Sequence, residues 1–153
     1  MNDFRISGIK DFSYNMTSLD VAKEISKILE EHGRGFVNLI SPIEIVKSCR
    51  RFYVLWQQIG SLEPIFIGTV AVNVSNGEIS ALCIKSKYRK MGLARKLIQF
   101  CIEAIRKEGG TNVIRAYVRE KNNEALHLFI SIGFKVTGKD DSAFELKLIE
   151  PKV

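Results

Sequence analysis

Hydrophobic positions follow two different spacings along this chain, and the spacing separates expected helices from expected strands. Apolar residues recur at three- and four-residue intervals over residues 17–31 and 41–50, which is typical of amphipathic helices. Each segment opens on a hydroxyl side chain, Thr17 or Ser41, that can accept a hydrogen bond from the first unpaired N–H groups. Pro42 suits the first turn of the second helix. The sequence therefore predicts two helices early in the chain.

A β-rich stretch comes next. Aromatic and β-branched residues dominate residues 52–56, 65–74 and 78–84, which favours three strands. Asn76-Gly77, between the last two, is a dipeptide typical of tight turns. We expect these three strands to form an antiparallel meander. A further short strand is expected at residues 4–9.

The second half of the chain returns to alternating helices and strands. Helical spacing begins at Leu93, and Gly109-Gly110 is expected to end that helix. The remaining expected elements are a strand at 112–119, a helix at 122–132, and a final hairpin of 134–138 and 143–149. The element order predicts a mixed α/β fold, with helices on the faces of a mixed sheet.

Composition indicates one globular domain spanning residues 1–153. The chain is 46% hydrophobic and 26% charged, which is ordinary for a soluble protein of this length. Its three cysteines lack paired spacing, so neither a disulfide framework nor a metal site is expected. No apolar run is long enough for a signal peptide or a membrane span, so we expect a cytoplasmic protein without a membrane partner.

The net charge of +6 narrows the class of partner. A basic surface can attract nucleic acid, an anionic membrane or an anionic cofactor. The basic residues gather at positions 85–96, at the start of a predicted helix, and this favours an anionic cofactor. A nucleic-acid-binding domain stays as an alternative, although we expect no nucleic-acid partner.

The centre of this basic segment is Arg89-Lys90-Met91-Gly92-Leu93-Ala94, between an apolar strand and an amphipathic helix. The first N–H groups of a helix have no partner within it, and the helix dipole adds partial positive charge there. Gly92 has no Cβ, so an anion can approach the backbone closely. The turn therefore predicts a phosphate site, and a solvated basic turn between core elements is the alternative.

Two segments resemble motifs of one family. Residues 89–94 resemble the Q/R-x-x-G-x-G/A pyrophosphate loop of the GNAT N-acetyltransferases. Residues 122–134 resemble the N-x-x-A-x-x-x-Y-x-x-x-G-F element of the same family, with Asn122, Ala125, Gly133 and Phe134 in place. The two segments occur in the family's order and at its usual separation. The spacing in the second segment also suits a plain core-facing helix.

The resemblance implies a GNAT fold, with a mostly antiparallel sheet of about seven strands and about four helices. It also implies acetyl-CoA as cofactor and direct transfer of the acetyl group to a primary amine within a ternary complex. The backbone N–H of Leu82 or Cys83 would stabilise the thioester oxyanion. The residues expected to hold acetyl-CoA are Leu82, Cys83, Ile84, Arg89, Lys90, Met91, Gly92, Leu93, Ala94, Asn122 and Phe129.

Candidate catalytic groups are Glu78 and Tyr117. Glu78 lies eleven residues before Arg89, which is the spacing of the glutamate base in the histone-acetylating branch of the family. An exposed carboxylate at the start of a strand is the alternative reading. Phe129 stands where the family often has a tyrosine that protonates the leaving thiolate, and phenylalanine has no proton to give. Tyr117, on the neighbouring strand, could take that role or pack against the sheet.

The acceptor cannot be read from the sequence. A small amine, a peptide N-terminus and a lysine side chain all stay open, as does a homodimer. The loss of the tyrosine at Phe129 keeps a second function in view, a CoA-binding sensor or interaction module with the same fold.

Overall fold

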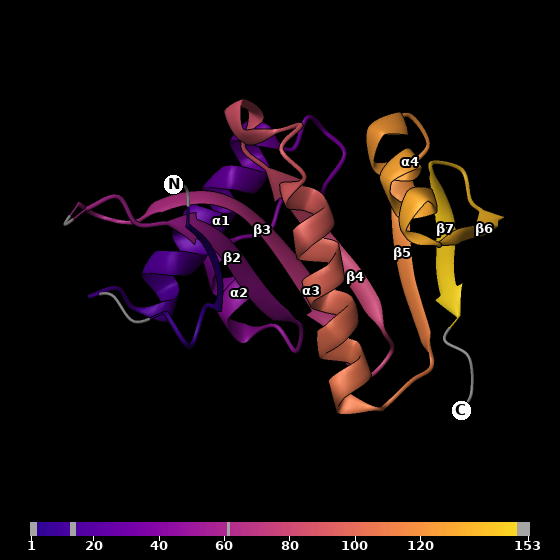
Figure 1. Cartoon of the computed structure of the whole chain (residues 1–153), viewed down its shortest axis with the longest axis horizontal. Coiled ribbons are helices and arrows are strands. Elements are labelled where there is room, and N and C mark those ends of the chain that lie inside the picture. Colours follow the sequence, from indigo (N-terminus) through magenta and orange to yellow (C-terminus); the bar gives the residue numbers. More distant parts are fainter. Residues whose placement is uncertain (1–2, 13–14, 61, 150–153) are drawn as a thin grey trace.

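One seven-stranded sheet runs through the protein. The computed structural model describes residues 3–12, 15–60 and 62–149, so the ends of the expected 1–153 domain lie outside the described residues. The strands lie in the order β1-β2-β3-β4-β5-β7-β6 (Figure 1). Their bounds are β1 Phe4–Gly8, β2 Arg51–Gln57, β3 Ile65–Asn73, β4 Glu78–Ile84, β5 Val113–Arg119, β6 Lys135–Lys139 and β7 Ala143–Ile149.

Neighbouring strands are antiparallel except for β4 and β5, which are parallel. The predicted mixed, mostly antiparallel sheet and the predicted β2-β3-β4 meander are therefore confirmed. The turn between β3 and β4 needs its glycine. Gly77 has φ +76°, and a Cβ added there would lie 2.2 Å from the carbonyl oxygen of Val113.

Four helices accompany the described strands, together with a short 3-10 turn, η1, at Ser86–Tyr88. The predicted cap of the first helix is present, because the Thr17 hydroxyl accepts a hydrogen bond from the Asp20 N–H at 3.1 Å. Among the described residues, no helix combines the length and the apolar character that crossing a bilayer requires. The helix bounds are α1 Ser18–His32, α2 Pro42–Lys47, α3 Leu93–Glu108 and α4 Asn123–Ile132.

Helix α2 is shorter than the sequence predicted. It ends at Lys47 and not near Arg50, because Ser48 adopts extended backbone angles, φ −64° and ψ +146°. The Ser48 hydroxyl accepts a hydrogen bond from the Arg50 N–H at 3.0 Å, which gives the backbone an alternative to the helix. The chain therefore leaves the helix early and brings Arg50 to the start of β2.

The helices cover the two faces of the sheet and bury separate clusters. Figure 1 shows α3 and α4 on one face and α1 and α2 on the other. Leu97 of α3 packs in one cluster with Ile114 of β5, and Ile25 of α1 packs in the other with Trp56 of β2. The central strand β3 has both faces covered, which explains why its sequence is a continuous apolar run.

The burial of two cysteines predicts a simple pattern of thiol reactivity. Cys83 and Cys101 are buried and Cys49 is exposed. Burial raises the pKa of the Cys101 thiol to about 12 and also raises the pKa of Cys83, so both stay protonated where a free thiol begins to ionise. With a colorimetric thiol reagent near neutral pH, we expect Cys49 alone to react rapidly, and all three cysteines to react in denaturant. Cys49→Ser should remove the rapid phase, and its persistence would contradict the described burial.

Candidate functional site

Strands β4 and β5 separate soon after they begin to pair. Pairing joins Glu78 to Arg115 and Ile79 to Ala116, although β4 continues to Ile84 and β5 to Arg119. The two strands diverge visibly beyond these pairs (Figure 1). The far half of β4 therefore presents its backbone to the gap on the β5 side. An extended ligand can bind such a backbone as an additional strand.

A bulge in β4 lies beside the point of divergence. The register between β3 and β4 shifts between Thr69 and Ala71, and Ala81 has φ +53°. A bulge places one more residue on one strand than on its partner and turns backbone groups out of the ladder. This local change gives the Ala81–Leu82 segment N–H groups that a ligand could use.

The first of two clefts is here called the turn cleft and has a volume of about 320 Å³. It lies between the end of β4, the β4–α3 turn, the segment after α1 and the start of α4. Of the residues predicted to hold the cofactor, Met91 does not line it, and Phe129 lines the second cleft instead. The predicted residues that line it are Leu82, Cys83, Ile84, Arg89, Lys90, Gly92, Leu93, Ala94 and Asn122.

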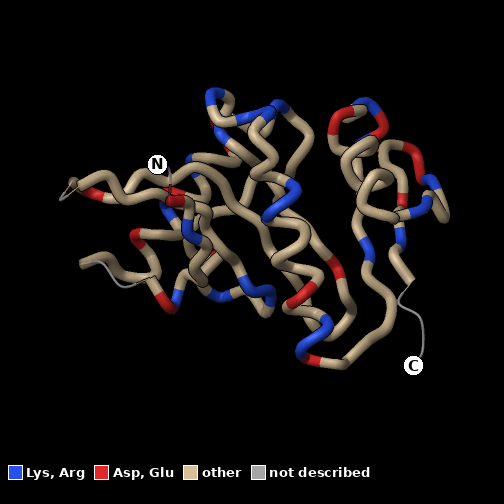
Figure 2. Tube along the Cα trace, in the orientation of Figure 1, with Lys and Arg blue, Asp and Glu red and all other residues tan. Residues whose placement is uncertain are grey.

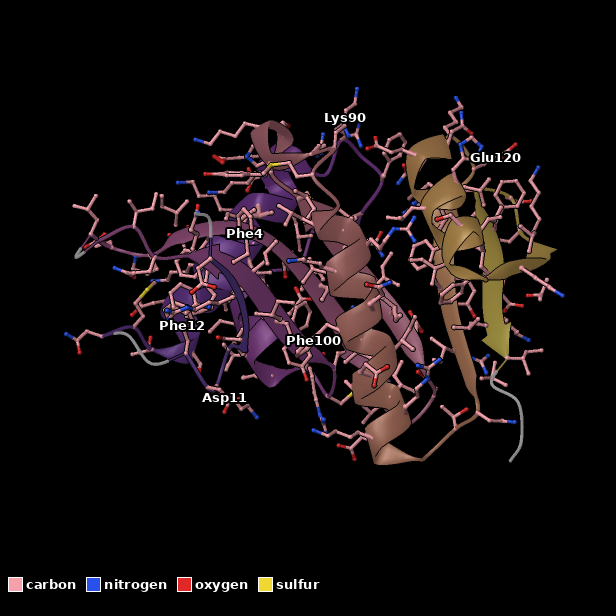
Figure 3. All side chains as sticks on the ribbon, in the orientation of Figure 1. Phe4, Asp11, Phe12, Lys90, Phe100 and Glu120 are labelled. Atoms are coloured by element: carbon pink, nitrogen blue, oxygen red, sulfur yellow. The ribbon has the colours of Figure 1, made fainter. Side chains whose placement is uncertain are left out.

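The start of helix α3 gives the turn cleft its anion-binding character. Gly92 is the N-cap residue with φ +76°, and a Cβ added to it would meet nothing within 4 Å. The backbone there is open to the cleft, so a phosphate group can reach the unpaired N–H groups of the first helical turn. Lys and Arg residues gather around this turn (Figure 2), and Lys90 lies at its tip (Figure 3).

The Arg89 side chain makes two contacts with backbone carbonyl groups that its motif does not indicate. Its Nε donates to the carbonyl oxygen of Ile84 at 3.1 Å, and its Nη2 donates to the carbonyl oxygen of His32. His32 also accepts a hydrogen bond on Nδ1 from the Ser86 N–H at 3.2 Å. Arg89 and His32 therefore hold the turn against the end of α1. The sequence contains no signal for His32, which lies 57 residues from Arg89.

The second cleft, here called the strand cleft, has a volume of about 570 Å³ and lies over the divergence of β4 and β5. Residues of both strands line it, from Glu78 to Leu82 on β4 and from Ala116 to Arg119 on β5. Residues 36–40, between α1 and α2, form another part of its wall. The two clefts meet at the residues that line both, which are Phe36, Val37, Leu82, Asn122 and Ala125.

Two residues of the second motif support this junction. The Asn122 side-chain oxygen accepts a hydrogen bond from the Ala125 N–H at 3.3 Å and so caps α4. The Phe129 ring is 3% exposed and packs edge-on against Phe134, with ring centroids 5.0 Å apart. Phe129 therefore contributes an apolar part of the cleft wall and no polar atom.

The structure brings Glu78 and Tyr117 to the same strand cleft. The Tyr117 hydroxyl donates a hydrogen bond to Glu145 Oε2 at 3.2 Å. Partial desolvation raises the pKa of Tyr117 above its usual range, and this hydrogen bond makes the next largest contribution. The hydroxyl therefore keeps its proton at neutral pH. Within the described chain, no group donates a hydrogen bond to the Glu78 carboxylate.

Backbone strain gathers at the two clefts. In the described part of the chain, three residues other than glycine have positive φ, namely Arg34, Ala81 and Lys90. Arg34 and Lys90 line the turn cleft, and Ala81 lines the strand cleft. Such conformations cost roughly 1–3 kcal/mol each and concentrate at functional sites. Their positions support a functional role for this pair of clefts.

The segment between α1 and α2 is the part of the site that sequence patterns did not reveal. Two polar contacts join it across the site to the second half of the chain. Arg34 forms an ion pair with Glu124 at 3.5 Å, and Arg119 donates to the Asn38 side-chain oxygen at 3.0 Å. Phe36, between these anchors, lines both clefts. The segment carries no sequence motif, so only its position in the structure identifies it as part of the site.

Comparisons with known proteins agree with this geometry. Residues 66–142 match a family model described as FR47-like protein. This range includes the bulge in β4, the basic turn and the start of α4, which contribute residues to both clefts.

Several solved structures share the fold over nearly the whole chain. The ribosomal-protein-S18-alanine N-acetyltransferase of Escherichia coli is 18% identical, with a TM-score of 0.68, and 99% of this chain aligns with 97% of that one. An acetyltransferase of the GNAT family from Streptococcus pneumoniae is 15% identical, with a TM-score of 0.68 and coverage of 99% and 100%. A chain of the NatC complex bound to Gag peptide and CoA is 18% identical, with a TM-score of 0.75 and coverage of 97% and 99%.

Proposed function

This chain belongs to the FR47-like family of GNAT-type proteins, and on that premise we propose that it transfers an acetyl group from acetyl-CoA to a primary amine. The observation that carries the proposal is the meeting of two clefts where β4 and β5 diverge. One cleft is basic and opens on a helix N-terminus, and the other holds the Glu78 carboxylate. Two substrates can therefore approach each other from opposite sides of Leu82.

The turn cleft fits acetyl-CoA. The open backbone at Gly92 and the N–H groups of the first turn of α3 would bind the pyrophosphate. Lys90 is exposed at the tip of the turn and would add charge, whereas Arg89 would hold the turn in place through its two carbonyl contacts. The diverging backbone of residues 82–84 would pair with the amide groups of the pantetheine arm.

The chemical step would take place where the clefts meet. An amine is largely protonated at neutral pH, so it must lose a proton before it can attack the thioester carbonyl. Glu78 would take that proton, directly or through water. The N–H of Leu82 or Cys83 would stabilise the oxyanion that forms on the carbonyl oxygen. Collapse of this intermediate breaks the carbon–sulfur bond, and Tyr117 would protonate the departing thiolate. The second proton on the attacking nitrogen would leave to water, from which Tyr117 would regain its own proton.

A second candidate function follows from Phe129. Its buried ring offers no proton at the position where the family motif often has tyrosine. A protein that binds CoA without turnover, as a sensor or interaction module, would have no need of that proton. The two functions differ in one result, because a sensor would bind acetyl-CoA but release no CoA with any amine.

Thermal unfolding with acetyl-CoA, CoA and ATP tests the proposed cofactor. A ligand at 100 times its Kd that binds the folded state alone stabilises it by about 2.7 kcal/mol. For a domain of this size, each kcal/mol raises Tm by roughly 2–4 °C. We expect acetyl-CoA and CoA to raise Tm by about 5–10 °C and ATP to have little effect. No shift at millimolar acetyl-CoA would mean that the basic turn is structural.

A second assay then tests turnover. The protein would be incubated with acetyl-CoA and a panel of primary amines, and released CoA and acetylated products would be measured. Product with any amine supports the transferase. Binding of acetyl-CoA without product across the panel would favour the sensor.

A further inference from the structure

The charges of the strand cleft carry information about the amine substrate. Two of its acidic side chains are engaged in local caps. The Glu44 carboxylate accepts a hydrogen bond from the Ser41 hydroxyl at 3.0 Å, and Asp140 Oδ1 accepts from the Ser142 N–H at 3.0 Å. The charged residues that line the cleft are Glu44, Arg50, Glu78, Arg119 and Asp140.

Arg50 is a half-buried cation, and the groups it contacts within the described residues are neutral. Its Nη1 donates to the Ser80 hydroxyl at 3.2 Å, and its Nε donates to the Ser48 hydroxyl at 3.3 Å. The guanidinium also stacks on the Phe52 ring, 4.9 Å from its centroid. It forms no ion pair with a carboxylate in the ranges that the structure describes. A cation that is held in place and partly desolvated without a counter-ion favours an anionic ligand.

Arg119 faces the same cleft from β5. It donates to the Asn38 side-chain oxygen at 3.0 Å and to the Ser142 hydroxyl at 3.4 Å. Arg119 also interacts with Asp140. Backbone hydrogen bonds lower the pKa of Asp140, and the positive charge of Arg119 lowers it further to a smaller extent. Arg119 is therefore partly compensated, whereas Arg50 lacks a comparable acidic neighbour among the described contacts.

Arg50 is anchored close to the residues proposed to react. Its anchor, Ser80, is two residues from Glu78 on β4, and both line the strand cleft. Residues two apart on a strand are separated by roughly 6.6 Å and point to the same face. Arg50 therefore lies beside the path from Glu78 to the bulge at Ala81. A small molecule bound in this part of the cleft could contact both the Glu78 carboxylate and the Arg50 guanidinium.

We propose that the acceptor is a free amino acid, a primary amine that carries a carboxylate within a few bonds. This proposal rests on the acetyltransferase function proposed above. The planar guanidinium of Arg50 matches a carboxylate in a two-point hydrogen bond. That contact would hold the substrate so that its amine lies near Glu78 and the thioester. An amine without a negative group would leave Arg50 without a counter-ion.

Matched substrate pairs test the proposal. Each of a panel of amino acids would be compared with its carboxamide, which keeps the amine and the side chain but removes the negative charge. We expect kcat/KM to favour the acid by roughly 10- to 100-fold for at least one pair, which is the range for a hydrogen bond to a charged group. Arg50→Gln should reduce this acid-over-amide ratio to near one, mainly through KM for the acid. Arg50→Lys should give an intermediate ratio.

The adjacent Arg51 supplies the control. Arg51 is exposed and forms an ion pair with Glu108 at 2.8 Å, away from the strand cleft. Arg51→Gln removes the same charge from the chain and should keep the acid-over-amide ratio. A far-UV spectrum and the shift of Tm with acetyl-CoA would show that each variant is folded and binds the cofactor.

Binding measured without turnover separates the possible failures. In the presence of CoA, the amino acid should raise Tm further in the wild-type protein but not in Arg50→Gln, and its carboxamide should do so in neither. Turnover that is equally good with acids and carboxamides would overturn the amino-acid proposal and leave the acetyltransferase intact. Binding of CoA with no additional effect of any amino acid on Tm or turnover would also overturn it. Failure of acetyl-CoA itself to bind would instead remove the proposed function.

Discussion

Gly92→Val is expected to weaken acetyl-CoA binding by at least about 100-fold, because it would place a branched side chain at the proposed site of the pyrophosphate. Gly92 lines the turn cleft with φ +76°, and a Cβ added there would meet nothing within 4 Å. A valine would occupy that space and would also strain the left-handed backbone that presents the N–H groups of α3. Isothermal titration with acetyl-CoA would measure the loss.

Gly109 provides a matched control at the other end of α3. It has φ +69°, and a Cβ added there also meets nothing within 4 Å, but it lies outside the turn cleft. Both valine variants should lose a similar free energy of unfolding, about 1–3 kcal/mol, from strain at a left-handed residue. Only Gly92→Val should lose acetyl-CoA affinity. Equal affinity in the two variants would show that the cofactor does not use the start of α3.

Glu78→Gln is expected to lower kcat by roughly 100- to 10,000-fold near neutral pH, which is the range for loss of a general base. Glutamine keeps the shape of the side chain but cannot accept the proton of the amine. The deficit should shrink as pH rises toward the pKa of the amine, about 10 for an alkyl amine, because the substrate then arrives without its proton. The measurement is the pH profile of kcat for the wild-type and variant proteins.

Glu103→Gln is a suitable control for this prediction. Glu103 is an exposed carboxylate on α3 that forms an ion pair with Arg106 at 2.9 Å, outside both clefts. It should keep the wild-type kcat and pH profile. If Glu78→Gln also kept them, Glu78 would be a solvated carboxylate at the start of a strand, and proton removal would have to be assigned to another group.

Features that depend on neighbours in the sequence were predictable. The cap of α1 needs Thr17 and Asp20, three residues apart, and both hydrogen bonds of the capping box are present. The apolar run of β3 reports burial on both faces. Helix α2 was predicted too long because apolar spacing continues beyond Lys47, whereas the hydroxyl of Ser48 competes for the backbone. The hydrogen bond of Ser48 is also a local interaction, but the spacing of apolar residues does not predict it.

The motifs indicated which residues lie at the turn cleft, but they did not indicate what each side chain contacts there. Gly92 and Leu82 line the turn cleft, and the Arg89 guanidinium contacts two backbone carbonyls. Phe129 was also expected to hold the cofactor; its ring packs against Phe134 and lines the strand cleft. A motif specifies residue types along one segment, and it does not specify which neighbouring segment uses their atoms.

By itself, the sequence determined the element order, the mixed sheet and the basic turn before α3. These follow from spacing, capping and charge within short segments. Only the tertiary structure decided that His32 supports the turn, that Phe36 lines both clefts, and that Arg50 and Glu78 line the same strand cleft. Contacts such as that of Arg50 with Ser80 join residues 30 positions apart. Such contacts form where parts of the chain that are distant in the sequence meet, as where the segment between α1 and α2 lies against the place where β4 and β5 diverge. The periodicity of the sequence reflects only neighbours along the chain, so it does not predict that arrangement.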